Sequence, residues 1–260
     1  MIFDTHAHYD DEAYNEDRDE LIKSLPENGV SNVVNISATL GGIKESLKLS
    51  EKYDMIYAAL GVHPEGISEL SDDEIKNITK LCIDNAVYSG GKVAAVGEIG
   101  LDHSYEDLDR ALQVKWFEAQ LDMAKKVNLP VVIHSRDAAE ETYEVMKSNK
   151  CEDIGGIVHC FSYSKEMAKK FLDMGFYIGV GGVLTFKNAR KLVEACEYIP
   201  LENIVLETDC PYLCPSPFRG QRNDSTMIKY VSEKLGEIKN LSPGEVEDIT
   251  ELNARRVYRL

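Results

Sequence analysis

The chain has 260 residues, of which 43% are hydrophobic and 28% are charged, and its formal net charge is −16. This length and composition fit one globular domain, which we expect to span residues 1–260. The sequence contains no run of about 18 apolar residues and no apolar leader, so we expect a cytoplasmic protein without a membrane partner, its six cysteines reduced. The negative charge argues against a broad basic surface for duplex DNA.

The chain opens on "MIFDTHAHYD", which places ionisable side chains at every second position from Asp4 to Asp10. Alternate residues of a strand point to the same side, so His6 and His8 share a face with these carboxylates. Such a face is costly to bury unless something binds it. Two imidazoles at this spacing can hold one metal ion, and an exposed edge strand with two ordinary histidines is the alternative.

Seven further short apolar segments follow in chain order, each rich in Val, Ile, Phe or Tyr and bounded by Gly, Pro or polar residues, as strands are. They cover residues 30–38, 55–64, 92–102, 129–136, 155–162, 175–182 and 203–211. Helical patterns separate them, most clearly at 106–128 and at 71–86, where Ser71 and Glu74 have the spacing of a helix cap. Eight alternating units predict an α/β fold, a single-domain (β/α)8 TIM barrel of the amidohydrolase type, with an open doubly wound sheet as the alternative.

Most of the histidines fall near the ends of these predicted strands. In a barrel the carboxyl ends of the strands meet at one mouth, where active sites are built. Each histidine taken alone is more often a packed core or surface residue, but their joint placement favours a site. The residues concerned are His6, His8, His63, Glu98, His134, His159 and Asp209.

Four histidines with one glutamate and one aspartate would make two coordination sets. Mixed nitrogen and oxygen ligands suit zinc, manganese, nickel, cobalt or iron better than calcium or magnesium. Six protein ligands are too many for one catalytic metal that keeps an open position, so two metals sharing a carboxylate is the simpler arrangement. Glu98 is central in strand order, and we expect it to be the bridge.

The chain resembles the TatD family of metal-dependent hydrolases across residues 4–258. The motifs that carry the resemblance are "DTHAHYD", "GVHP", "GEIGLD", "PVVIHSRDA", "HCFS", "LETDCPYLCP", "FRGQRN" and "NARRVY". The resemblance implies a two-metal barrel, with His63 near the substrate and two divalent ions per chain, Zn, Mn, Ni, Co or Mg. Family members are described as deoxyribonucleases, and some are linked to removing D-amino acids from tRNA. The implied metal ligands are His6, His8, Glu98, His134, His159 and Asp209.

The sequence departs from the family pattern in two places. The family usually has glycine after "HCFS", where this chain has Tyr163, which could narrow the mouth or stack on a base. The usual "RGxxNEP" is "RGQRNDS" here, with Asp224 and Ser225 in place of Glu and Pro. Both changes leave the ligand set intact and affect what is expected of the substrate.

The expected chemistry is attack of a metal-activated water on phosphorus, with Asp209 as the acceptor of its proton or as a ligand only. Local cations in this acidic chain would contact substrate phosphates or instead pair with nearby carboxylates. Aromatic side chains near the mouth would stack on bases or simply pack. Buried carboxylates at the strand ends would orient the histidines or form salt bridges. The cations are Arg136, Arg219 and Arg222. The aromatic side chains are Tyr163, Tyr212 and Phe218, and the buried carboxylates are Asp4, Asp102 and Glu207.

Three functions stay open on the sequence alone. The first is an exonuclease-type deoxyribonuclease acting on single-stranded DNA, DNA ends or another phosphodiester. The second is a hydrolase of ester or amide bonds, such as a D-aminoacyl-tRNA deacylase. The third is a non-catalytic metal- or nucleic-acid-binding protein, which would not need an open two-metal site. No obligate protein partner is expected.

Overall fold

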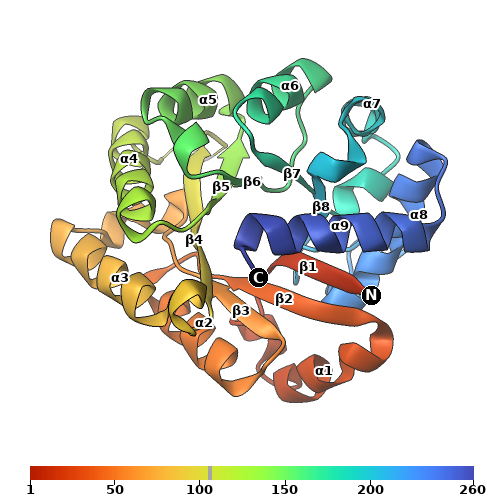
Figure 1. Ribbon diagram of the computed structural model, residues 1–260, viewed down its shortest axis with the longest axis horizontal. Helices are drawn as coiled ribbons and strands as arrows, with labels where there is room; N and C mark the ends of the chain where they lie inside the picture. Colours follow the sequence, from red (N-terminus) through yellow and green to blue (C-terminus); the bar gives the residue numbers. More distant parts are fainter. Residues whose placement is uncertain (105–106) are drawn as a thin grey trace.

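The computed structural model describes residues 1–104 and 107–260, and within them eight parallel strands pair in the order β1 to β8 (Figure 1). The first four strands are β1 Ile2–Ala7, β2 Val30–Ile36, β3 Ile56–Ala59 and β4 Val93–Asp102. The other four are β5 Val131–Arg136, β6 Gly156–Val158, β7 Tyr177–Val180 and β8 Ile204–Leu206. All eight predicted strand segments therefore contain a strand.

Contacts between the first and the last strand close the sheet. Ala7 forms a parallel bridge with Cys210, and the Thr5 hydroxyl donates to the Leu206 carbonyl at 3.0 Å. An open doubly wound sheet reverses its strand order near the first strand and keeps two free edges, whereas here the order is sequential and the last strand bonds to the first. The (β/α)8 barrel prediction is therefore confirmed.

Helices surround the barrel (Figure 1). The α-helices are α1 Arg18–Ser24, α2 Leu40–Lys52, α3 Asp72–Asn85, α4 Arg110–Val127, α5 Ala139–Ser148, α6 Lys165–Asp173, α7 Arg190–Tyr198, α8 Ile228–Lys239 and α9 Pro243–Tyr258. Short 3₁₀ helices are η1 Glu12–Tyr14, η2 Pro26–Asn28, η3 Pro64–Glu69, η4 Val87–Ser89, η5 Cys151–Asp153, η6 Gly182–Thr185, η7 Leu201–Asn203 and η8 Ser225–Met227. In the described part of the chain, no helix has both the length and the apolar character needed to cross a bilayer.

The two clearest predicted helices show how local caps set their starts. Ser71 caps α3 as predicted, its hydroxyl accepting from the Glu74 amide at 3.2 Å. The pattern at 106–128 becomes α4, which begins only at Arg110 because the Asp109 carboxylate accepts from the first free amides of the helix. Glu106, the predicted first residue, lies outside the described residues.

The strands end at different points from those that the sequence predicts. β3, β6 and β8 stop early, so His63, His159 and Asp209 lie in the loops that follow them. At Asp209 the backbone adopts φ +57°, a left-handed conformation that cannot continue a strand. Glu98 lies inside β4, because pairing with β5 carries that strand on to Asp102.

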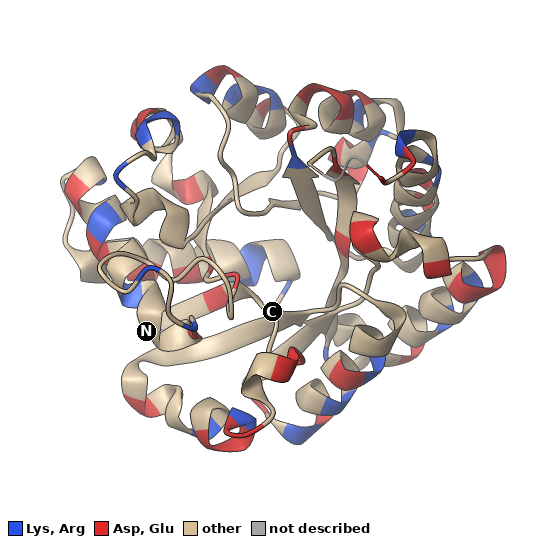
Figure 2. Ribbon diagram, turned by 180° about the vertical axis from the view of Figure 1, so that it is seen from behind, with Lys and Arg blue, Asp and Glu red and all other residues tan. Residues whose placement is uncertain are grey.

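The amino-terminal end of the barrel is filled with apolar side chains and covered by α9, which crosses it in Figure 1. Phe3 stacks on Tyr258 with ring centroids 6.0 Å apart, and Val205 and Val257 lie in the same cluster. The Tyr258 hydroxyl donates to the Thr5 carbonyl at 2.7 Å. This end is sealed, so the ionisable residues occupy the opposite end. Figure 2 shows the molecule from that side, with acidic and basic segments interspersed over the outer helices.

Candidate metal centre

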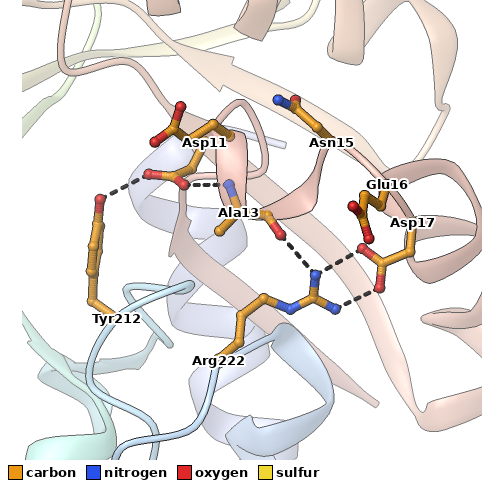
Figure 3. A pocket seen from close by; sticks show the side chains of 8 residues that line it. Asp11, Ala13, Asn15, Glu16, Asp17, Tyr212 and Arg222 are labelled. Carbon is orange, nitrogen blue, oxygen red and sulfur yellow. Dashed lines mark hydrogen bonds and ion pairs between the residues drawn. The ribbon is translucent and has the colours of Figure 1, made fainter.

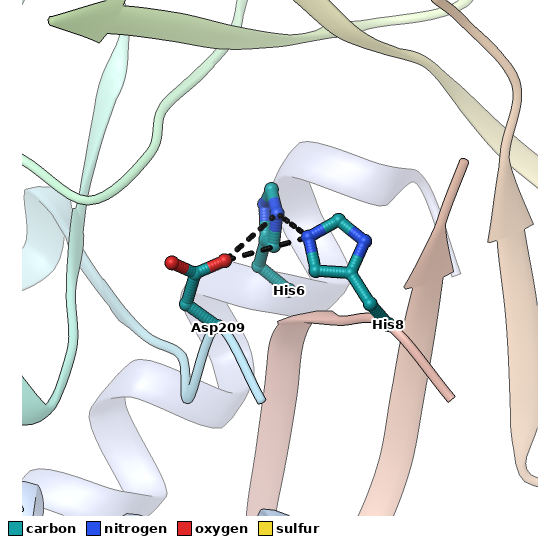
Figure 4. Close-up of side chains that lie close together, drawn as sticks. All are labelled: His6, His8 and Asp209. Atoms are coloured by element: carbon teal, nitrogen blue, oxygen red, sulfur yellow. Dashed lines mark hydrogen bonds and ion pairs between the residues drawn. The ribbon is translucent and has the colours of Figure 1, made fainter. Parts of the chain in front are cut away.

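The first set of converging side chains comprises His6 in β1, His8 just after that strand and Asp209 in the loop after β8 (Figure 4). The Nε2 atoms of His6 and His8 lie 3.1 Å apart. The Asp209 Oδ1 atom lies 3.6 Å from the first and 3.4 Å from the second. Three donor atoms at these separations can bind one ion.

Glu98 connects this set to a second one. Its Oε1 atom lies 2.6 Å from His134 Nδ1 and 2.7 Å from His159 Nε2. Its other oxygen, Oε2, lies 3.4 Å from His6 Nε2 and 3.8 Å from His8 Nε2. Each carboxylate oxygen thus faces a different pair of histidines, and the structure brings all six predicted ligands together.

The hydrogen bonds on the far side of two rings test whether the cluster fits metal ions. His8 Nδ1 lies 2.8 Å from the Ile36 carbonyl, which can only accept, so Nδ1 carries the proton. His134 Nε2 likewise faces the Asp102 carboxylate at 2.9 Å. The opposite nitrogens then face the Asp209 and Glu98 carboxylates, and each position favours a cation between the nitrogen and the carboxylate. A proton fills it where no metal is bound, in line with the raised pKa of both rings, and a metal ion can take the place of that proton, so the donor set fits metal ions.

Burial and pKa shifts agree with this interpretation. Glu98 is 3% exposed, His6 1% and His159 4%. Burial by itself would raise the pKa of Glu98, but the His159 and His134 rings hold it well below the usual range. Burial lowers the pKa of His134, yet the Glu98 and Asp102 carboxylates outweigh it and raise that pKa to about 9. The cluster therefore attracts positive charge strongly.

Asp4 lies deeper in the barrel than His6, His8 and Asp209, and it fixes the backbone that carries His6 and Asp209. Its fully buried carboxylate accepts from the hydroxyls of Thr208 and Ser225, both at 2.6 Å, and from the His6 amide at 3.2 Å. Burial raises the pKa of Asp4 to about 6. Ser225 also accepts from the Tyr9 hydroxyl at 2.9 Å. The unusual serine thus joins β1 to the loop after β8, a role that the sequence pattern does not indicate.

The other two buried carboxylates are placed differently. Asp102 contacts His134 directly and is held by the Ser104 hydroxyl at 2.6 Å. Glu207 accepts from the Cys160 amide at 2.5 Å but lies 3.8 Å from His159 Nδ1, too far for a direct hydrogen bond. Burial raises the pKa of Glu207 to about 8.

His63 lies at the edge of the cluster. Its ring meets that of His134 edge-on at 4.2 Å, and its Nε2 atom is 4.0 Å from Glu98 Oε1. Burial lowers its pKa to about 4, so the ring is neutral at pH 7. His63, Asp102 and His134 form a further group of donor atoms close enough to hold an ion. Asp102 lies four positions after Glu98 on one strand, a spacing that could have indicated a shared face.

The three candidate arginines have different partners. Arg222 forms two bonds with the Asp17 carboxylate, at 2.8 and 2.5 Å (Figure 3). Arg219 lies over the Phe186 ring, 4.3 Å from its centroid. In the described part of the chain, no carboxylate lies within 4 Å of the guanidinium groups of Arg136 and Arg219. Two arginines are therefore available for an anion, and the third is committed to an ion pair.

The aromatic candidates also differ. Tyr163 is half-buried and its hydroxyl lies 3.1 Å from the Ser135 hydroxyl, so this residue fills space at the start of α5. Phe218 packs against Tyr230 at 5.3 Å. Tyr212 is exposed beside His8. Asp224 caps η8 by accepting from the Thr226 amide at 2.8 Å, which gives the substituted loop its path.

Comparison with known proteins agrees with the site and the fold. The family described as TatD related DNase matches residues 3–259. The uncharacterized metal-dependent hydrolase YabD of Bacillus subtilis is 39% identical over 260 residues, covering 100% of both chains. The uncharacterized metal-dependent hydrolase YcfH of Escherichia coli is 31% identical over 263 residues, covering 100% of this chain and 96% of the relative.

Solved structures give the same result. The crystal structure of YJJV, a TatD homolog from Escherichia coli, has a TM-score of 0.92 at 30% identity and covers 100% of this chain and 98% of that one. A phosphotriesterase homology protein from Escherichia coli shares the fold, with a TM-score of 0.67 at 14% identity over 99% of this chain and 98% of that one. The chain therefore belongs to the TatD family of metal-dependent hydrolases.

Proposed function

We propose that this chain is a deoxyribonuclease that hydrolyses phosphodiester bonds at the ends of single-stranded DNA with two divalent metal ions. The observation that carries the proposal is the position of Glu98, whose two oxygens face two separate pairs of histidines. The description of the matching family supports the choice of substrate. The donor residues come from β1 through to the loop after β8, so residues 1–260 act as one domain in this proposal.

Each side chain then has a definite task. His6, His8 and Asp209 would hold one ion, His134 and His159 the other, and Glu98 would bridge them. When bound, two such ions offset charge on a phosphoryl group and lower the pKa of water. Asp209 directs Oδ1 at the two histidines. Its other oxygen remains to accept a proton from the attacking water, and the neighbouring histidines keep its pKa low despite burial, so the acceptor is ionised.

The charges around the mouth support action at DNA ends. Arg136 is the last residue of β5, the strand opposite β1 in an eight-stranded barrel. Arg219 lies over the ring of Phe186, which belongs to the loop after β7. The β1 side instead carries acidic residues on and beside η1; of the two arginines there, Arg18 is bonded to the Tyr9 and Asp11 carbonyls and Arg222 is paired with Asp17. A phosphate chain is attracted on one side of the metals and repelled on the other. With His63 and Tyr163, the two free arginines form the proposed substrate contacts.

The test measures hydrolysis of three substrates by the metal-loaded protein. They are linear single-stranded DNA, the same DNA closed into a circle, and a D-aminoacyl-tRNA. We expect hydrolysis of the linear DNA and little of the other two. Asp209→Asn serves as the catalytic control and should lose the activity while keeping the fold. Release of the D-amino acid without DNA cleavage would favour the deacylase, since the same site can serve both reactions. Equal cleavage of circular and linear DNA would contradict action at ends.

A further inference from the structure

The backbone of Tyr212 is fixed beside the metal cluster. Its amide donates to the Asp209 carbonyl at 3.0 Å, and its own carbonyl accepts from the Asn223 side chain at 2.7 Å. Asn223 is fully buried and also binds the Thr208 carbonyl. The residue therefore cannot swing away from the mouth without breaking the turn that carries Asp209.

The ring of Tyr212 is fixed at its other end as well (Figure 3). Its hydroxyl donates to Asp11 Oδ2 at 2.8 Å, and Asp11 Oδ1 in turn accepts from the Ala13 amide at 2.8 Å. A hydroxyl with this partner has no proton to offer a substrate, so what the residue presents is its aromatic face. Tyr212 is nevertheless 54% exposed. An exposed ring held at both ends has little entropy left to lose on binding.

The ring lies close to one proposed metal ligand. The centroids of Tyr212 and His8 are 6.3 Å apart, with the rings inclined at 63°. A planar group joined to a phosphate at the metals by one sugar can reach this face. Of the other aromatic candidates, Phe218 is packed on Tyr230 and the Tyr163 hydroxyl is bonded to Ser135.

The surface beyond Tyr212 is acidic and would repel a further phosphate. A pocket there is lined by Tyr212, Arg222 and four carboxylates, Asp11, Glu12, Glu16 and Asp17. The guanidinium of Arg222 is paired with Asp17, and that of Arg18 donates to the Asp11 carbonyl at 3.0 Å beside the pocket, so two positive charges stand against the four negative ones. A continuing DNA strand would have to bring phosphates into this field.

We infer that Tyr212 stacks on the base of the terminal nucleotide, and that the acidic pocket behind it prevents the strand from continuing past that base. This inference rests on the proposed deoxyribonuclease function and adds to it a residue that selects the end of the substrate. Stacking on an aromatic ring is tolerant of sequence, since every base has a π face. Tyr212 and the acidic pocket together would select the end of a strand without selecting which base is there.

The test compares two oligonucleotides that differ only in the terminal nucleotide on the attacked end, one with its base and one abasic. End-labelling first establishes which end is attacked. For the substrate with a base we expect Tyr212→Ala to raise KM about tenfold or more, with kcat changed less. The same variant should leave the abasic substrate unchanged, and wild-type protein should itself prefer the terminal base. Tyr212→Phe keeps the ring, loses only the bond to Asp11, and should stay near wild type on both.

Melting temperature and bound metal are measured for each variant, so that a folding defect is recognised. Equal losses on both oligonucleotides at unchanged metal content would assign Tyr212 a structural role and overturn the inference. Conversion of a wild-type dimer to a monomer by Tyr212→Ala would overturn it too, because the ring would then be a subunit contact. Failure of metal-loaded wild-type protein to cleave either DNA is a separate result, which removes the proposed function together with the inference.

Discussion

The two ends of the barrel use the same strands for opposite purposes. In β1, Phe3 packs beneath α9 at the closed end, and His6, three residues later, points a ring nitrogen at Glu98. The closed end is mainly hydrocarbon, and its Tyr258 hydroxyl and Asn253 side-chain amide donate to backbone carbonyls, whereas the open end buries carboxylates and imidazoles together. Burying apolar surface stabilises the fold, and burying unpaired charge opposes it. Stability and chemistry are therefore separated along each strand.

Removing metal should separate the two ends of the barrel most strongly, because it should abolish hydrolysis at the open end and leave the closed end folded. We expect a chelator to abolish hydrolysis and added Mn²⁺ to restore it, because the open end depends on cations and the closed end does not. The far-UV circular dichroism spectrum should change little at room temperature, while the melting temperature falls because ligand binding stabilises the native state. Full activity in protein shown to be metal-free would refute the two-metal proposal.

Glu98→Gln is expected to reduce turnover by on the order of 10²-fold or more, since a neutral amide cannot hold two cations together. Metal content should fall from two ions per chain towards one, measured by elemental analysis. Glu141→Gln is a matched control, because this glutamate contacts His103 and lies outside the proposed ligand set. Unchanged metal content with near-normal turnover would remove Glu98 from the bridging position.

Phe3→Ala tests the closed end. Truncating this buried ring should lower the free energy of unfolding by about 3–5 kcal/mol. At a temperature where the variant is folded, kcat should stay within a few-fold of wild type, because the ligands are held by separate contacts. Leu252→Ala on α9 is the control, since its side chain is 54% exposed and should cost little. Loss of kcat in fully folded Phe3→Ala protein would show that the two ends are coupled.

The smallest expected effects separate two arginines of one loop. Arg219→Ala should raise KM for DNA several-fold and lower the slope of the salt dependence by about one unit. A small phosphodiester that does not extend past the metals should be unaffected. Arg222→Ala should instead lower the melting temperature, and by more than Asp17→Asn does, because Arg222 also donates to the Ala13 carbonyl and lies over the Tyr14 ring. A raised KM in Arg222→Ala with a lowered melting temperature in Arg219→Ala would instead make Arg222 the substrate contact and Arg219 the structural residue.

Sequence periodicity predicts the barrel because each strand and helix has a local pattern, and strand order then places the histidines at one mouth. It predicts exact strand ends less well, since these depend on pairing between strands: β4 continues past Glu98 only because β5 lies beside it. It does not predict which distant residue a loop side chain contacts. Arg219 and Arg222 look alike in the sequence, and only folding shows that one meets Phe186 and the other Asp17.

The bond from Tyr258 to the Thr5 carbonyl joins residues 253 positions apart. During synthesis, β1 emerges first and waits for both of its neighbours at the closed end, β8 and α9, which are made last. The closed end is therefore sealed only after α9 has been made, later than the last strand of the barrel. At the open end, His6 and His8 lack Asp209 only until β8 and the loop after it have been made. A nascent chain that stops before Asp209 is therefore expected to be catalytically silent, whereas one that stops between β8 and α9 has every proposed ligand but an unsealed closed end.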